Sequence, residues 1–304
     1  MKRHLDVSPE VKAAIPGGRV VALETTVVAH GLPYPQNLTT AREMESIVTR
    51  EGAVPAAIAL MDGKARIGLP SAALEELATA RGVLKISRRD LASCLVQRRT
   101  GATTVAATMF LAHMAAIKVF ATGGIGGVHR APAGLPPTDV SADLPELART
   151  PVCVVCSGAK SILDLPATLE WLETWGVPVI GYGCDELPAF YVRSSGLRLV
   201  LHADSPAEVA DLCRTHWALG MGGVLVTVPI PQEDALEPGM AEEATEQALA
   251  EAAAEGITGS ATTPFVLKRM VELTGGATLK ANIALLRNNA AVAASVAVAL
   301  AKAR

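Results

Sequence analysis

A glutamate and a lysine stand at the ends of apolar runs, where side chains of these types can do acid–base and nucleophilic chemistry. Glu24 closes the run that begins at Arg19, and an unpaired carboxylate there would be costly to bury. A role as general acid or ligand would explain it, and so would a salt bridge at a strand end. Lys160 follows the run Val152–Cys156 through small residues. A lysine that is partly withdrawn from water attacks carbonyl carbons, although most lysines are merely solvated.

Oxygen and amide donors form a second group of candidates. Asp139 and Asp143 flank Ser141, and carboxylate oxygens are what Mg²⁺ or Mn²⁺ prefers. Two aspartates at this spacing could equally be loop and helix-cap residues, which is the commoner arrangement. Asn282 and Asn288–Asn289 interrupt an apolar helical segment. Asparagine is a poor helix former, so these positions suggest a polar contact to a ligand or to a partner chain.

Glycine-rich segments could let the backbone approach a small anion closely. Gly123–Gly127 has the required glycine density but does not fit the G-x-G-x-x-G dinucleotide signature. Gly101–Val105 lies at a predicted helix start, where N–H groups could bind phosphate or where glycine could simply permit tight packing. Lys85 lies in an apolar run nearby. His30 and His113 are isolated from other ligand types and are interpreted as structural.

Short apolar runs that alternate with amphipathic segments predict a layered α/β protein. Asp62-Gly63 predicts a hairpin turn, and Thr40 with Glu43 fits a helix capping box. Strands are predicted at residues 19–24, 57–61, 64–69, 83–87, 117–122, 152–156, 177–181 and 223–228. The main helices are predicted at residues 40–50, 71–81, 103–116, 242–255, 263–273 and 280–302, with a further one starting at Ser205.

The carboxyl ends of these strands are where an α/β fold gathers its ligands. That edge would receive Glu24, Lys85 and Lys160. Residues 123–139 show almost no regular pattern, and a long irregular segment inside a compact domain is usually functional. We find no repeat, no low-complexity linker and no charge discontinuity, so residues 1–304 are predicted to form a single domain.

Composition excludes several classes of function. Hydrophobic residues make up 50% and charged residues 19%, which is typical of a packed protein and not of a disordered one. A net charge of −3 and 3% aromatic residues argue against a nucleic-acid polymer as partner. Apolar stretches such as Ala290–Ala301 fall short of the roughly 20 residues that span a bilayer, so no membrane association is expected.

The cysteine pattern favours the cytoplasm. Five cysteines are scattered through the chain, unlike a secreted disulfide framework. Cys153 and Cys156 match C-x-x-C, but the run predicts a buried strand. Side chains three apart on a strand point to opposite faces, which disfavours a redox or metal role for the pair.

Five sequence blocks together resemble the family of pseudouridine-5′-phosphate glycosidases, also called pseudouridylate synthases or indigoidine synthase A-like proteins. The likeness runs in order from about residue 8 to residue 302. The blocks are Ala22–Pro33 (ALETTVVAHGLP), Val105–Met109 (VAATM), Phe120–Arg130 (FATGGIGGVHR), Ser141–Leu144 (SADL) and Ser157–Asp164 (SGAKSILD).

The resemblance implies a three-layer α/β/α fold with a central mixed, mostly parallel sheet. It implies a Mn²⁺-dependent homotrimer in nucleoside catabolism that reversibly cleaves the C–C glycosidic bond of pseudouridine 5′-phosphate, giving uracil and ribose 5-phosphate. Lys160 would be the nucleophile that forms an imine with C1′ of the ring-opened ribose, and Glu24 the proton donor. Asp139 would hold the metal. Substrate would be bound by Lys85, Val105, Ser141, Ala142, Asp143 and Asn282.

The implied chemistry agrees with the residues at the strand ends. A C–C bond to the sugar lacks the heteroatom leaving group that ordinary glycosidases protonate, so two carboxylates alone would serve poorly. A lysine imine supplies the missing electron sink, and protonation at C5 of the base lets uracil leave neutral.

Some positions depart from the family pattern. Val228 stands before Pro229 where asparagine is expected, and Cys184 and Val192 replace threonines. Residues 131–138 form an unusual run of alanine, proline and leucine. Because Val228 and this loop could alter selectivity for base or sugar, the reaction type is predicted more firmly than the substrate.

Three other functions compete with this one. A Schiff-base aldolase or lyase on another phosphosugar would use the same lysine, but uracil would not stimulate synthesis. A non-catalytic nucleotide-binding or scaffold protein would tolerate Lys160→Ala. A dinucleotide-dependent dehydrogenase is disfavoured because the glycine fingerprint is missing.

Overall fold

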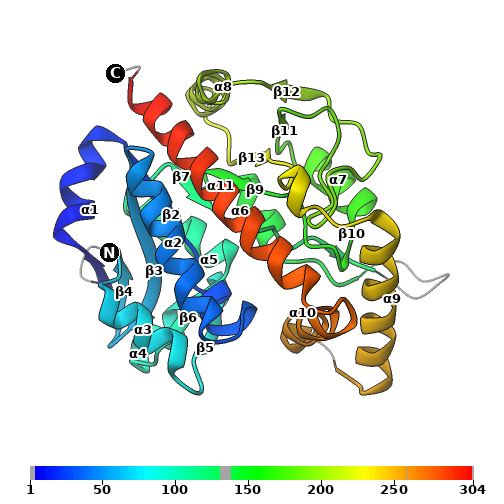
Figure 1. The fold of residues 1–304 in the computed structure, drawn as a ribbon. Helices are drawn as coiled ribbons and strands as arrows, with labels where there is room; N and C mark the ends of the chain where they lie inside the picture. Colours follow the sequence, from blue (N-terminus) through cyan, green and yellow to red (C-terminus); the bar gives the residue numbers. More distant parts are fainter. Residues whose placement is uncertain (1–3, 131–137, 258, 303–304) are drawn as a thin grey trace.

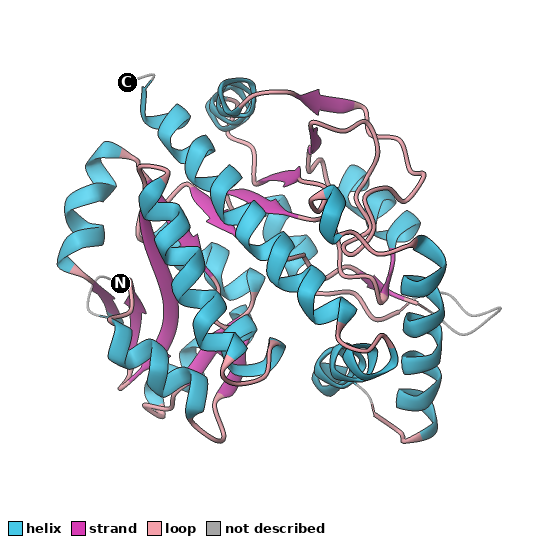
Figure 2. Ribbon diagram, in the orientation of Figure 1, coloured by secondary structure: helices cyan, strands magenta, loops and turns pink. Residues whose placement is uncertain are grey.

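The computed structural model describes residues 4–130, 138–257 and 259–302, and an eleven-stranded sheet runs through its centre (Figures 1 and 2). From β3 onwards, neighbouring strands of the main path are parallel. The order of that part is β3 (Val54–Met61), β2 (Val20–Leu23), β7 (Val119–Ala121), β9 (Cys153–Cys156), β13 (Val224–Thr227), β11 (Val179–Tyr182) and β12 (Leu201–Ala203).

The other edge of the sheet is mixed. β4 (Lys64–Ile67) and β6 (Gly101–Thr103) are antiparallel to β3, while β1 (Leu5–Val7) is parallel to β4 and β5 (Leu84–Ile86) is parallel to β6. The antiparallel pair β8 (Val128–His129) and β10 (Leu163–Asp164) forms a separate small sheet. Sequence patterns missed these two-residue strands because no periodicity is visible over such a length.

Helices cover both faces of the sheet and make three layers. In Figure 1, α2 (Gln36–Arg50) and α11 (Ala277–Lys302) cross in front of the strands, and α5 (Val105–Met114) and α6 (Asp143–Arg149) lie behind them. The predicted three-layer α/β/α architecture with a mixed, mostly parallel sheet is therefore confirmed. The other helices are α1 (Pro9–Ala14), α3 (Ser71–Thr79), α4 (Leu91–Val96), α7 (Leu165–Thr174), α8 (Pro206–Ala218), α9 (Pro238–Ala254) and α10 (Thr262–Leu273).

The longest helix, α11, packs along the middle of the fold. Its 26 residues include an 18-residue window that is apolar enough to cross a membrane by length and composition alone, a test that a core helix can also pass. The helix nevertheless lies against α2, α8, β7 and β9, and small buried residues such as Ala290, Ala293 and Ala294 line its inner face. We interpret α11 as a core helix of the fold.

The predicted hairpin turn is confirmed, whereas the predicted start of one helix is wrong. Asp62 and Gly63 both have positive φ, and Met61 pairs with Lys64, as the predicted hairpin requires. The capping box at Thr40 was wrong, because α2 already begins at Gln36 and Thr40 is buried inside it. The side chain of Asn37 donates to the Val28 carbonyl at 2.7 Å, a tertiary contact that anchors the earlier start.

The cysteines are all free thiols. Cys153 and Cys156 are both buried in β9, and the neighbouring Cys213 of α8, together with burial, raises the pKa of Cys153. Burial raises the pKa of Cys156 to about 12, so this thiol stays protonated. The observed burial agrees with the interpretation of the C-x-x-C run as an ordinary buried strand.

Candidate active site

A cavity of about 760 Å³ opens at the carboxyl ends of the parallel strands, between the sheet and helices α10 and α11. Segments from both halves of the chain line it. Every site residue that the family resemblance implies lies in its wall: Glu24, Lys85, Val105, Asp139, Ser141, Ala142, Asp143, Lys160 and Asn282. The fold thus brings together residues that the sequence spreads over more than 250 positions.

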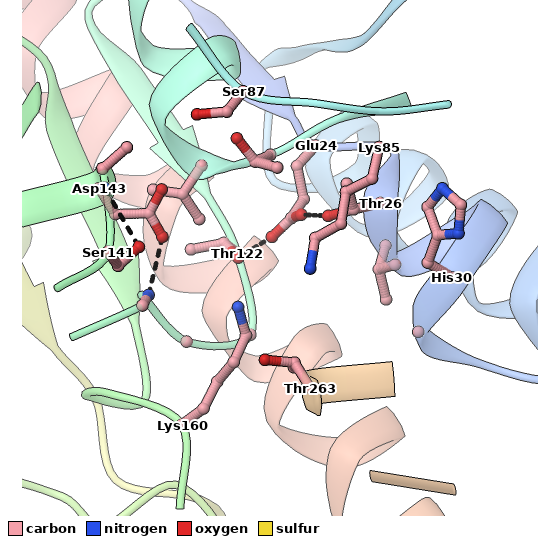
Figure 3. A pocket seen from close by; sticks show the side chains of 18 of the residues that line it. Glu24, Thr26, His30, Lys85, Ser87, Thr122, Ser141, Asp143, Lys160 and Thr263 are labelled. Carbon is pink, nitrogen blue, oxygen red and sulfur yellow. Dashed lines mark hydrogen bonds between the residues drawn. The ribbon is translucent and has the colours of Figure 1, made fainter. Parts of the chain in front are cut away.

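Glu24 follows β2 directly and turns its carboxylate into the cavity (Figure 3). Both of its oxygens accept a hydroxyl hydrogen bond. Thr26 donates to Oε2, and Thr122, which follows the neighbouring strand β7, donates to Oε1. Both oxygens of the carboxylate that would be costly to bury alone therefore have a hydrogen-bond donor.

Lys160 lies in the turn after β9, and its amine points into the cavity (Figure 3). Its backbone is held at both groups, because N–H donates to the Ile125 carbonyl at 3.1 Å and the carbonyl accepts from Leu163 N–H at 3.0 Å. Gly158 must be glycine here, since its φ is +82° and a Cβ would lie 2.2 Å from the Pro188 carbonyl oxygen.

Arg130 fixes the outer side of the same turn. Its guanidinium donates to the backbone carbonyls of Ser161 and Leu163 at 3.1 and 3.4 Å, and it pairs with Glu242 of α9. The turn that carries Lys160 is therefore hydrogen-bonded to the glycine segment through Ile125 and is linked to α9 through Arg130.

A second lysine, Lys85 of β5, enters the cavity opposite Lys160 (Figure 3). Burial lowers the pKa of the Lys85 ammonium, and the positive charge of Lys160 lowers it further. The carboxylates of Asp143 and Glu24 act in the opposite direction. The cavity therefore combines two amines with a carboxylate, a set that can bind an anion and form an imine with a carbonyl compound.

Asp143 joins the glycine segment to the start of α5. Its Oδ1 accepts Ala106 N–H at 2.9 Å, and its Oδ2 accepts Gly126 N–H at 2.8 Å. Ser141 Oγ in turn accepts the Asp143 N–H at 3.2 Å. Because both carboxylate oxygens of Asp143 are occupied by backbone donors, this side chain fixes the shape of the cavity wall around Val105 and Ser141.

Two asparagines of α11 have different surroundings. Asn289 is fully buried and donates to the carbonyl of Thr122 at 2.9 Å and to Ser157 Oγ at 3.1 Å. Asn282 is only 8% exposed and lines the cavity beside Gly123, yet its amide has no hydrogen bond within the described residues. Buried polar groups are usually satisfied, so the Asn282 amide is available to a ligand.

Asp139 lies exposed at the rim of the cavity. Its backbone carbonyl accepts His129 N–H at 2.9 Å, and no partner of its carboxylate is found among residues 4–130, 138–257 and 259–302. In the same ranges, no group of three or more histidine, cysteine or acidic side chains could hold a metal ion. The carboxylate oxygens of Asp139 are donors of the type that Mn²⁺ prefers, so this residue could hold such an ion.

Several cavity residues were given no role by the sequence, although some of them were expected at strand ends. Thr26, Thr122 and Thr263 supply hydroxyl groups, and His30, interpreted as structural, also lines the wall. A basic rim comprises Arg88, Arg89 and Arg149, and Ser87 lines the cavity next to Arg88. The position of Thr122 and Ser87 directly after strands was the one available signal.

Arg88 of this rim is held by a buried acid. It contacts both carboxylate oxygens of Glu146 at 2.8 and 2.7 Å and stacks over the Phe110 ring, 4.5 Å from its centroid. Glu146 is fully buried and far away in the sequence, so no local pattern could have linked the two.

Three of the unusual positions, Val228, Cys184 and Val192, lie outside the described wall of the cavity. Val228 is 4% exposed and donates its backbone N–H to the Cys156 carbonyl at 2.8 Å, so it packs behind the lysine strand. Cys184 and Val192 do not line the described part of the cavity either. Of the unusual run at residues 131–138, only Thr138 is among the described residues.

The chain is similar to proteins of one family along almost its whole length. Residues 10–299 match the family described as indigoidine synthase A like protein. A protein from Caldanaerobacter subterraneus that is named pseudouridine-5′-phosphate glycosidase is 53% identical, over 99% of this chain and 98% of its own length. A protein of the same name from Methylobacterium nodulans is 55% identical, over 99% of this chain and 89% of its own.

Solved structures give the same result. The prealnumycin C-glycosynthase AlnA, crystallised in complex with ribulose 5-phosphate, has a TM-score of 0.90 and 40% identity, covering 98% of this chain and 97% of its own. An indigoidine synthase A-like protein from Thermotoga maritima has a TM-score of 0.89 and 35% identity at the same coverage. The likeness therefore includes the segments that line the cavity.

Proposed function

Because this chain belongs to the indigoidine synthase A-like family, we propose that it reversibly cleaves the C–C glycosidic bond of pseudouridine 5′-phosphate to uracil and ribose 5-phosphate. One observation carries the proposal: an amine and a carboxylate, Lys160 and Glu24, face each other in one cavity at the strand ends. Cleaving this bond requires an electron donor at C1′ of the sugar and a proton for the base, and these two groups supply both.

The sugar is activated first. The unprotonated Nζ of Lys160 adds to C1′ while the C1′–O4′ bond opens and O4′ takes up a proton. The pentose is then an open chain attached to the enzyme, and the lone pair on nitrogen can stabilise positive charge at C1′.

The base leaves next. Glu24 delivers a proton to C5 of the pyrimidine, and the electrons of the C1′–C5 bond restore the C5=C6 double bond as the C1′=N imine forms. Uracil departs as a neutral molecule. Water then hydrolyses the imine, which releases ribose 5-phosphate and the amine of Lys160, and synthesis follows the same steps in reverse.

The remaining predicted contacts suggest where the ends of the substrate lie. Lys85 and the N–H of Val105, at the first turn of α5, offer a positive charge and the positive end of a helix dipole to the phosphate. Ser141, Ala142 and Asp143 complete this side of the cavity. Asn282 lies on α11 beside Gly123, where it would contact the base.

Replacing Asn282 by alanine is expected to raise KM for uracil about tenfold in the synthesis direction, with little change in KM for ribose 5-phosphate. An amide can donate to and accept from the imide edge of uracil, and losing such bonds costs about 1–3 kcal/mol. Steady-state kinetics with each substrate varied in turn measures the effect. Asn288→Ala is the matched control, because Asn288 bonds the Pro229 carbonyl instead. An equal rise in both KM values would argue against a base contact.

We further propose that Asp139 holds a Mn²⁺ ion that the reaction requires. The ion would supply positive charge at the cavity rim for the phosphorylated sugar. Asp139→Asn is expected to weaken Mn²⁺ binding by about tenfold or more, as measured by electron paramagnetic resonance of the free ion. Asp211→Asn, on the surface of α8, is the control. Unchanged Mn²⁺ affinity in Asp139→Asn would place the ion elsewhere.

The oligomeric state is proposed from the family resemblance, and the cellular compartment from the cysteines. We propose a homotrimer, for which sedimentation should give three times the 31.4 kDa mass of the chain. A cytoplasmic location is favoured by the five free thiols.

The function is tested by mixing purified protein, Mn²⁺, uracil and ribose 5-phosphate and following pseudouridine 5′-phosphate by chromatography. Product in this direction, and its cleavage in the other, supports the proposal. If no product forms but a phosphosugar is still trapped by borohydride, the lysine chemistry stands and the substrate is a different one.

A further inference from the structure

The carboxylate of Glu24 is held by two threonines and by no other hydrogen bond in the described parts of the chain. Thr26 is two residues away in sequence, while Thr122 reaches it from the end of the adjacent strand β7. Figure 3 shows the three side chains in a line, with the carboxylate between the two hydroxyl groups. The arrangement fixes both carboxylate oxygens and therefore the direction in which the group faces the cavity.

Threonine suits a carboxyl group that must lose and regain a proton. A hydroxyl can donate to an ionised carboxylate and, after rotating, can accept from a protonated one. A lysine or arginine partner has no acceptor and would favour the ionised form alone. Two hydroxyl partners therefore hold the geometry of Glu24 in both protonation states.

Thr122 is the more rigid of the two partners. It is 1% exposed, its N–H donates to the Val155 carbonyl of β9 at 3.0 Å, and its own carbonyl accepts the Asn289 amide at 2.9 Å. Thr26 is half-buried and precedes the π-helical turn Val27–Gly31. The position of the Glu24 carboxylate is thus set mainly by Thr122, which follows β7 and is held by Asn289 of α11. Thr26 adds the second contact.

We propose that Thr122, assisted by Thr26, is a positioning residue that aims the Glu24 carboxyl at the carbon to be protonated. This inference rests on the proposed function, in which Glu24 delivers the proton to the base. It assigns to the threonines a part in base release and none in imine formation at Lys160.

Thr122→Val, which keeps the shape and removes the hydroxyl, tests the inference. The expected result is a fall in kcat for pseudouridine 5′-phosphate cleavage of about 10- to 100-fold, since misplacing a catalytic group by about 1 Å can cost 100-fold. KM is expected to stay within about twofold, and borohydride trapping of ribose 5-phosphate should proceed as in the wild type. Thr122→Ser should recover most of kcat, and Thr26→Val should show a smaller loss.

Thr245→Val is the matched control, because Thr245 is a fully buried threonine whose hydroxyl bonds the Ala241 carbonyl within α9. Wild-type kcat in Thr122→Val would overturn the inference. So would a Thr122→Ser enzyme as slow as Thr122→Val, or a parallel loss of trapping and turnover, which would indicate a general distortion. If the wild type itself does not cleave pseudouridine 5′-phosphate, the proposed function fails before the threonines are tested.

Discussion

Replacing Lys160 by alanine is expected to reduce cleavage of pseudouridine 5′-phosphate by about 10³-fold or more, the scale on which loss of a nucleophile acts. The physical reason is that C1′ loses the nitrogen lone pair that stabilises its developing positive charge, and no leaving-group heteroatom is present to compensate. Lys160→Arg should be equally inactive, because a guanidinium keeps the positive charge but cannot give up its proton to become a nucleophile. Stopped assays for uracil release measure both variants.

Lys85 offers the contrasting case. It is the other amine of the cavity, assigned to substrate binding, so Lys85→Arg should retain measurable kcat with a raised KM. Substantial turnover by Lys160→Ala would contradict the assignment of the nucleophile. Folding of each variant is checked by its thermal unfolding, which we expect to change little because Lys160 is a partly exposed turn residue.

Replacing Glu24 by glutamine is expected to lower kcat for cleavage by about 10²- to 10⁴-fold. This is the factor that general acid catalysis typically contributes. Glutamine has nearly the same shape and can still meet the hydroxyls of Thr26 and Thr122, but it cannot deliver a proton. Imine formation between ribose 5-phosphate and Lys160 should persist. The measurement compares uracil release with borohydride trapping in the same preparation.

Normal uracil release by the glutamine variant would exclude the role of Glu24 as proton donor. If Glu24→Gln releases uracil at the wild-type rate, the proton comes from another group of the cavity. Glu43→Gln is the matched control, because Glu43 lies on the exposed face of α2 and pairs with Arg287, well outside the cavity wall.

The sequence predicted the location of the site because α/β chemistry concentrates at strand ends. Glu24 and Lys160 each follow an apolar run directly, and parallel strands β2 and β9 deliver them to the same edge on either side of β7. The hairpin at Asp62-Gly63 could be predicted equally well, because these two residue types favour the positive φ angles that the turn requires.

Tertiary partners could not be predicted in this way. Thr122 lies 98 residues from Glu24 in the sequence, and Glu146 lies 58 residues from Arg88, so each pairing exists only after strands and helices have packed. The start of α2 was misplaced for the same reason, since the contact of Asn37 with the Val28 carbonyl overrides the local capping signal. The distinction between Asn282 and Asn289 likewise depends on what surrounds each amide.

The most direct test of the central claim is to reduce the enzyme with borohydride in the presence of ribose 5-phosphate and to sequence the modified peptide by mass spectrometry. The account predicts a reduced ribose phosphate on Lys160, within the segment Ser157–Asp164, and none on Lys85. An adduct on Lys85, or full turnover with no adduct on any lysine, would contradict the mechanism.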